Sequence, residues 1–146
     1  MKNALKIGFL CFCLFSGISV KAQLYGNYEL KFTAGTTEHL GLLRMYANGF
    51  SGLLRIKYYN QLLSDYTVVE QQVRLENGPN GIRLAGYYPV FANTQISHPG
   101  YIADKFYFLS NGRVVNVDDL GVQAETYSRR IYYDWDLTKL CREFNW

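Results

Sequence analysis

Apolar and polar residues alternate along much of the chain after position 23. In the first run, 24–33, one face carries Leu24, Tyr28, Leu30 and Phe32, and the other carries Tyr25, Asn27, Glu29, Lys31 and Thr33. A period of two with one polar face is typical of a half-buried β-strand. Runs rich in aromatic and β-branched residues recur beyond it, separated by Gly and Asn turns. This pattern predicts a β protein.

Three turn sequences predict hairpins. Loops at 48–51, 77–80 and 111–112 would pair Arg44 with Arg55, Arg74 with Arg83, and Lys105 with Asp118, respectively. The Asn111-Gly112 turn is the strongest of these signals, because both residues tolerate positive φ. It would also place Phe106 opposite Val117, and Phe108 opposite Val115.

These registers assign a buried face to each hairpin. The predicted core residues are Leu43, Met45, Leu54, Ile56, Tyr58, Val69, Val73, Leu75, Ile82, Leu84 and Tyr88. A further strand is expected within 120–133, and 60–64 and 90–100 are expected to be connections. At the C-terminus, Leu137, Leu140, Cys141 and Phe144 follow helical spacing after Asp134 and Asp136. We therefore predict an all-β fold: an antiparallel meander of seven or eight strands, closed as a barrel or folded as a sandwich, with a short C-terminal helix.

The first 22 residues have the pattern of a secretory signal peptide. Lys2 and Lys6 precede a short apolar run, and small residues lead to Ala22. The run is shorter than the roughly 20 residues of a membrane-spanning helix. We expect cleavage after Ala22, which leaves residues 23–146 as one domain that is secreted or periplasmic.

Removing this leader changes the charge balance. The full chain has 15 Lys and Arg against 12 Asp and Glu; three of the basic residues, Lys2, Lys6 and Lys21, lie in the leader, so 12 of each sign remain. A neutral domain gives no electrostatic reason to expect nucleic-acid binding. Of the three cysteines, only Cys141 lies after the leader, so no disulfide is expected within the domain.

The sequence carries no recognisable catalytic chemistry. His39 and His98 are the two histidines, and neither lies in a nucleophile motif. They do not make a zinc site with Cys141, since zinc needs three or four ligands. Asp118-Asp119 is explained as the end of a strand. We predict a protein that is not an enzyme and that needs no cofactor or metal.

The polar face is the candidate binding site. Basic side chains project from it away from the predicted core, with tyrosines that supply flat apolar surface. The predicted ligand-binding residues are Arg44, Tyr46, Arg55, Lys57, Arg74, Arg83 and Tyr87. Arg and Tyr are common in interfaces. The alternative is a solvated ladder in which Glu29, Glu70 and Glu76 neutralise the basic residues.

A second aromatic group contains Tyr87, Tyr88, Tyr132, Tyr133 and Trp135; it indicates either ligand stacking or core filling. In outline, the early Gly26-Asn27-Tyr28, the strand number and the late helix resemble a small calycin barrel. Tyr28 stands where the lipocalin family has Trp, and Ser64-Asp65-Tyr66 comes too early for that family's second motif, so no family assignment follows.

Three functions remain open. The preferred one is an exported, non-catalytic domain that binds a protein, a glycan or a small apolar molecule. Because the predicted core is bulky, recognition at the surface is favoured over an internal cavity. The second is a small outer-membrane barrel, which the shortness of several strands disfavours. The third is a secreted hydrolase with scattered catalytic residues.

Overall fold

The computed structural model describes residues 23–146, so the predicted signal peptide and its cleavage site lie outside the described residues. Within these residues, eight antiparallel strands precede one helix. The strands are β1 (Asn27–Ala34), β2 (Thr37–Met45), β3 (Ser51–Asn60), β4 (Asp65–Gly78), β5 (Gly81–Phe91), β6 (Lys105–Phe108), β7 (Val114–Val117) and β8 (Gln123–Ile131), and the helix is α2 (Asp134–Glu143). The predicted meander and C-terminal helix are confirmed.

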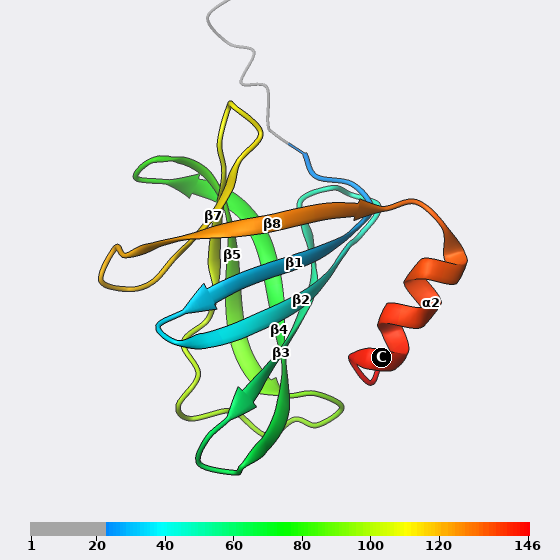
Figure 1. Ribbon diagram of the computed structural model, residues 1–146. Coiled ribbons are helices and arrows are strands. Elements are labelled where there is room, and N and C mark those ends of the chain that lie inside the picture. Colours follow the sequence, from blue (N-terminus) through cyan, green and yellow to red (C-terminus); the bar gives the residue numbers. More distant parts are fainter. Residues whose placement is uncertain (1–22) are drawn as a thin grey trace, which may run out of the picture.

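The strands close into a barrel in sequence order, with β8 hydrogen-bonded back to β1 (Figure 1). The turns after β1, β3, β5 and β7 lie at one end, which we call the distal end. The turns after β2, β4 and β6 lie at the other, proximal end, together with residues 23–26. Leu24 helps close the proximal end: it donates its backbone N–H to the Gly49 carbonyl and packs against the core.

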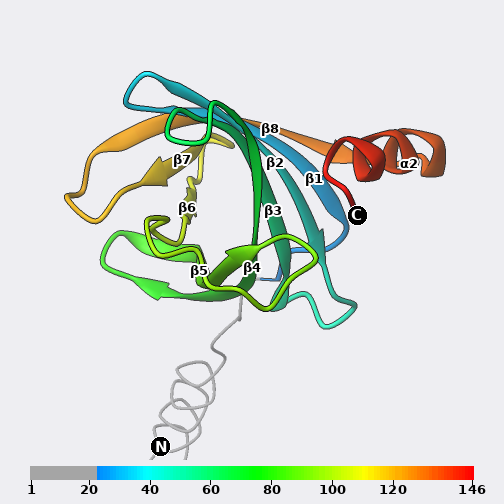
Figure 2. The same cartoon turned by 90° about the horizontal axis from the view of Figure 1, so that it is seen from below.

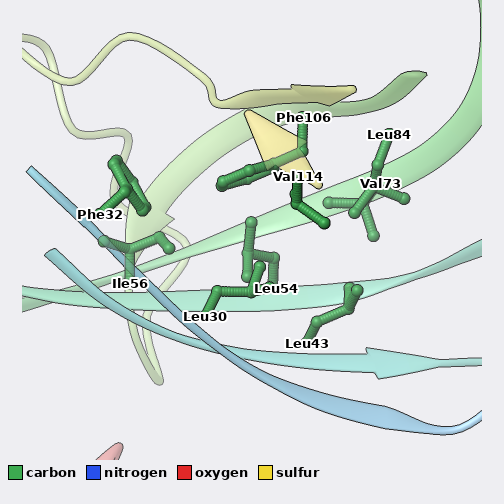
Figure 3. Packing of buried hydrophobic residues seen from close by; sticks show 9 residues of the cluster. All are labelled: Leu30, Phe32, Leu43, Leu54, Ile56, Val73, Leu84, Phe106 and Val114. Atoms are coloured by element: carbon green, nitrogen blue, oxygen red, sulfur yellow. The ribbon is translucent and has the colours of Figure 1, made fainter. Parts of the chain in front are cut away.

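The barrel interior is filled by apolar side chains that point toward one another (Figure 3). These side chains are almost wholly buried: Leu30, Phe32, Leu43, Leu54, Ile56, Val73, Leu84, Phe106 and Val114. Every strand except β8 contributes at least one. An eight-stranded barrel is just wide enough for side chains to fill its interior. The predicted filled core is therefore confirmed.

Helix α2 lies outside the barrel wall (Figure 2). Leu140 and Phe144 pack against Leu42 and Ile131, which are buried although they face away from the interior. Cys141, on the expected face, is half-buried beside them. The helix thus covers an outer face that alternation alone would leave to solvent.

Two predicted hairpin registers are wrong by two residues. Arg44 pairs with Leu53, and Leu42 with Arg55. Glu76 pairs with Arg83, so Arg74 lies opposite Ala85. In the first turn, Asn48 Oδ1 accepts the backbone N–H groups of Phe50 and Ser51, which moves the centre of the turn toward the N-terminus. A shift of two residues keeps each side chain on its face, so most of the inward positions in these two hairpins were still predicted correctly.

The third hairpin is wrong by one residue, which exchanges the two faces of β7. Phe106 pairs with Asn116, and Phe108 with Val114. Leu109 donates its N–H to the Arg113 carbonyl, so the turn between them has an odd number of residues. Asn111-Gly112 alone predicts a turn with an even number of residues. Asn116 consequently enters the interior, and Lys105 forms its ion pair with Asp119, not Asp118, at 2.9 Å.

Two predicted core residues lie outside the core. Glu70 pairs with Val90 but Gln72 pairs with Tyr87, so Tyr88 and Pro89 both lie opposite Gln71 in a β-bulge. Tyr88 has a φ of 53° there and is 72% exposed. Ile82, beside the β4–β5 turn, is 37% exposed. The bulge redirects the side chains of β5 in a way that alternation could not predict.

Candidate functional site

Among the predicted ligand-binding residues, Arg55 is not a surface residue but is 4% exposed. Its Nε donates to Glu70 Oε2 at 2.8 Å, and its Nη1 donates to the backbone carbonyls of Phe144 and Asn145. Its Nη2 donates to Asn93 Oδ1 at 2.8 Å. Arg55 thus fastens the end of α2 to the barrel, and the prediction that it projects into water is wrong.

The two basic neighbours of Arg55 also face the C-terminal segment. The Arg44 guanidinium lies 4.9 Å from the Trp146 ring centroid, and that of Arg55 lies 4.7 Å from the same ring. Lys57 Nζ lies 3.4 Å from the Glu143 carbonyl oxygen. The structure therefore gives these three residues a shared structural partner, the end of the helix.

The remaining predicted residues form a separate group on β4 and β5, apart from Tyr46. Arg83 and Glu76 form an ion pair at 2.8 Å, and Tyr87 donates its hydroxyl to the other oxygen of Glu76. These donors hold the pKa of Glu76 below its usual value. Arg74 lies 5.5 Å over the Tyr87 ring. Tyr46, half exposed, follows β2. Of the three glutamates expected to neutralise the basic residues, Glu70 pairs with the buried Arg55 and Glu76 pairs with Arg83, whereas Glu29 pairs with Arg129 and Lys31.

The second aromatic group is divided in space. Tyr87 contacts Tyr88 on β5, while Tyr133 stacks on Trp135 after β8, and β5 and β8 are not neighbouring strands. The structure therefore forms two separate aromatic pairs where the sequence suggested one cluster.

A polar network lies inside the distal half of the barrel, which the sequence analysis missed. Asp104 Oδ2 accepts from Gln71 Nε2 at 2.6 Å and from the Tyr101 hydroxyl at 2.8 Å. Its Oδ1 accepts from Asn116 Nδ2 at 3.2 Å. Burial raises the pKa of Asp104, although its three donors oppose the change. Gly86 makes room for the network, since a Cβ there would lie 2.3 Å from Gln71 Oε1.

Both histidines belong to an aromatic stack beside this network. The His39 ring lies between Phe32 and Tyr58, with centroid distances of 5.0 and 5.2 Å. His98 stacks on Phe91, and its Nε2 lies 2.9 Å from the Tyr58 hydroxyl. Tyr101, in the β5–β6 connection, contacts both groups, since its ring lies 5.5 Å from that of Tyr58 and its hydroxyl donates to Asp104.

A groove opens at the distal end where β1 and β8 separate. The two strands pair only as far as Lys31 and Tyr127, although β1 continues to Ala34 and β8 begins at Gln123 (Figure 1). The groove has a volume of about 740 Å³. We call it the distal groove; it is lined by Lys31, Phe32, Thr33, Gly35, Glu38, Gln123, Ala124, Glu125 and Tyr127. None of these lining residues was among the predicted site residues.

The groove combines one flat exposed ring with fixed polar groups. Tyr127 is 54% exposed, and Lys31 Nζ lies 5.9 Å from its ring centroid. Lys31 also lies 3.5 Å from Glu29, and Glu125 forms an ion pair with Arg113. The charges beside the groove are therefore largely paired within the protein. In the sequence, this groove could have been indicated only by the alternating positions of β8 that carry polar residues and Tyr127. These positions lie beside β1 only because the barrel closes.

Among residues 23–146, no group of three His, Cys, Asp or Glu side chains is arranged to hold a metal ion. Within the same range, no helix is long and apolar enough to cross a membrane. No protein-family model, curated protein or solved structure matches the chain.

Proposed function

We propose that this chain is an exported, non-catalytic binding protein whose ligand lies in the distal groove. One observation carries the proposal: the wall of an otherwise filled barrel parts between β1 and β8 and leaves a groove of about 740 Å³. The groove is shallow and open to solvent, and the mouths of β-barrels are among the preferred places of ligand sites.

The filled interior supports binding at the mouth of the barrel over binding in a central cavity. Phe32 is 4% exposed and forms part of the groove wall, with the His39 ring directly behind it. Since Phe32 and His39 offer almost no accessible surface, a ligand would contact the exposed lining residues, such as Thr33 and Tyr127, and remain partly in water. This agrees with the expectation of surface recognition, at a different surface from the arginine face.

The direction of the side chains favours this proposal over an outer-membrane barrel. Membrane-spanning barrels present an apolar band outward. In this barrel the large aliphatic cluster faces inward, and charged groups such as the Arg83–Glu76 and Arg113–Glu125 pairs lie on the outer side.

A fragment screen followed by NMR tests the proposal. A library of small soluble molecules is added to the ¹⁵N-labelled protein, and backbone shift changes are mapped. Binders are expected to shift the amides of Thr33, Gln123 and Tyr127. The variant Thr33→Trp, which adds a large ring at an exposed groove position, should abolish these shifts, whereas Thr138→Trp on the exposed side of α2 should leave them unchanged. Binding that maps elsewhere, or none at all, would overturn the proposal.

A further inference from the structure

We propose that the distal groove is one half of a longer site, which binds an uncharged glycan chain laid across the β1–β2 turn. This inference rests on the proposed function, because it uses the same groove, and it adds the class of ligand and the direction in which the ligand runs. The observation behind it is a second groove on the opposite side of the turn, which shares Glu38 with the first.

The second groove is small and lies along the starts of β2 and β4 and the end of β3. It has a volume of about 260 Å³ and is lined by Thr36, Thr37, Glu38, Leu40, Lys57, Tyr59, Gln61 and Tyr66. Since this volume falls below the roughly 300 Å³ at which ligand pockets begin, it extends a neighbouring site better than it serves alone. Glu38 lines both grooves, so a chain that leaves the distal groove past Glu38 enters the second one directly.

Both grooves offer aromatic rings to a ligand. Tyr127 in the distal groove is 54% exposed, and Tyr59 and Tyr66 in the second are 45% and 62% exposed. Tyr59 and Tyr66 lie opposite each other on β3 and β4, with ring centroids 5.5 Å apart. Lys57 Nζ lies 5.3 Å from the Tyr66 ring centroid, much as Lys31 lies over Tyr127. Such rings are large, rigid contact surfaces with a polar hydroxyl at one end, which suits the apolar C–H faces and polar rims of sugar rings.

The polar lining suits hydroxyl groups better than charges. Around the rings lie neutral side chains that donate and accept hydrogen bonds, namely Thr33, Thr36, Thr37, Gln61 and Gln123. Both grooves also carry a lysine and at least one glutamate, so neither offers a surface of one charge sign to a charged ligand. A purely apolar ligand would bury these polar groups without partners, which is unfavourable. An uncharged, polyhydroxylated chain carries no charge and supplies hydrogen-bond partners to these polar side chains.

The test measures binding of neutral oligosaccharides to the purified protein. The probes are soluble β-1,4-linked glucose oligomers of increasing length, together with an array of other neutral glycans and of uronate-containing glycans. We expect neutral glycans to bind, with affinity that rises with chain length until both grooves are occupied. No binding by any neutral glycan, or preferential binding of the uronate-containing ones, would overturn the inference.

Single tyrosine variants separate the two grooves. Tyr127→Ala should weaken binding of all lengths by about tenfold, the loss expected from one stacking contact of roughly 1.4 kcal/mol. Tyr59→Ala should leave short oligomers unaffected and remove the gain with length. Tyr132→Ala, which removes another exposed tyrosine ring outside both grooves, is the matched control. Thermal unfolding checks that each variant is folded. Equal effects of Tyr59→Ala at every length, or none from Tyr127→Ala, would contradict the two-groove arrangement.

The outcomes also separate this inference from the proposed function. If fragments map to the distal groove while no neutral glycan binds, only the glycan inference fails. If glycans bind but Tyr127→Ala has no effect and fragments do not map to the groove, both fail.

Discussion

Replacing Arg55 with Ala should destabilise the protein more than any other change on its basic outer face. The side chain is 5% exposed and is paired with Glu70, and it also donates to two carbonyls at the end of α2 and to Asn93. Its loss would leave Glu70 without its partner and the Phe144 carbonyl buried without a donor. It would also remove one of the two cations that contact the Trp146 ring.

The size of the effect follows from the type of interaction. Removing one partner of a buried ion pair costs about 3–5 kcal/mol. The individual hydrogen bonds to a charged group, about 1.5–3 kcal/mol each, are not additive with that figure. Glu70 is 24% exposed, so water relieves part of its cost and the lower end of the range applies, about 3 kcal/mol. With an m-value near 2 kcal/mol per M, the urea midpoint should fall by about 1.5 M.

Urea unfolding followed by tryptophan fluorescence and by far-UV circular dichroism measures this change. Arg44→Ala is the matched control, because Arg44 contacts the same ring from a half-buried position and should cost only about 0.5–1 kcal/mol. A midpoint for Arg55→Ala within about 0.5 M of the native protein, or equal to that of Arg44→Ala, would refute the role of Arg55 as the fastening point of the helix.

Two further predictions concern the network around Asp104. Gly86→Ala should destabilise the protein by about 1–3 kcal/mol in urea unfolding, because the added Cβ would lie 2.3 Å from Gln71 Oε1 and force that side chain from its place; a neutral result would mean that the network tolerates displacement. The second prediction is a pH effect. Since burial raises the pKa of Asp104 above its usual 3.8, the folded state keeps a proton that the unfolded state has already lost. The free energy of unfolding should therefore fall as pH rises from about 4 through the raised value. The Asp104→Asn variant should lack this fall in the free energy of unfolding. Parallel pH profiles for the variant and the native protein would contradict the assignment of the effect to Asp104.

The sequence already determined the antiparallel meander, the C-terminal helix and most of the inward face, while the choice between a barrel and a sandwich came only from the closure of β8 onto β1. Alternation in the segment 24–33 predicted that Leu30 and Phe32 are buried, and helical spacing placed Leu140 and Phe144 on one face of α2; all four are buried. These inferences depend on local geometry, because the side chain period of a strand or helix is the same wherever the element lies.

Turn geometry was less predictable. A side chain contact such as that of Asn48 with the backbone of Ser51 shifts a register by two residues and leaves the faces unchanged. An odd turn at 109–113 shifts it by one and brings Asn116 inside.

The functional surfaces depended wholly on tertiary structure. The burial and hydrogen bonding of Arg55 were decided by residues about 90 positions later in the chain, which cover its side chain and accept its hydrogen bonds. The distal groove exists because β1 and β8, the first and last strands, meet and then separate after Lys31 and Tyr127. Within an uninterrupted strand or helix, local pattern determines which way a side chain points, whereas burial, pairing and grooves depend on what distant parts of the chain bring to that side chain.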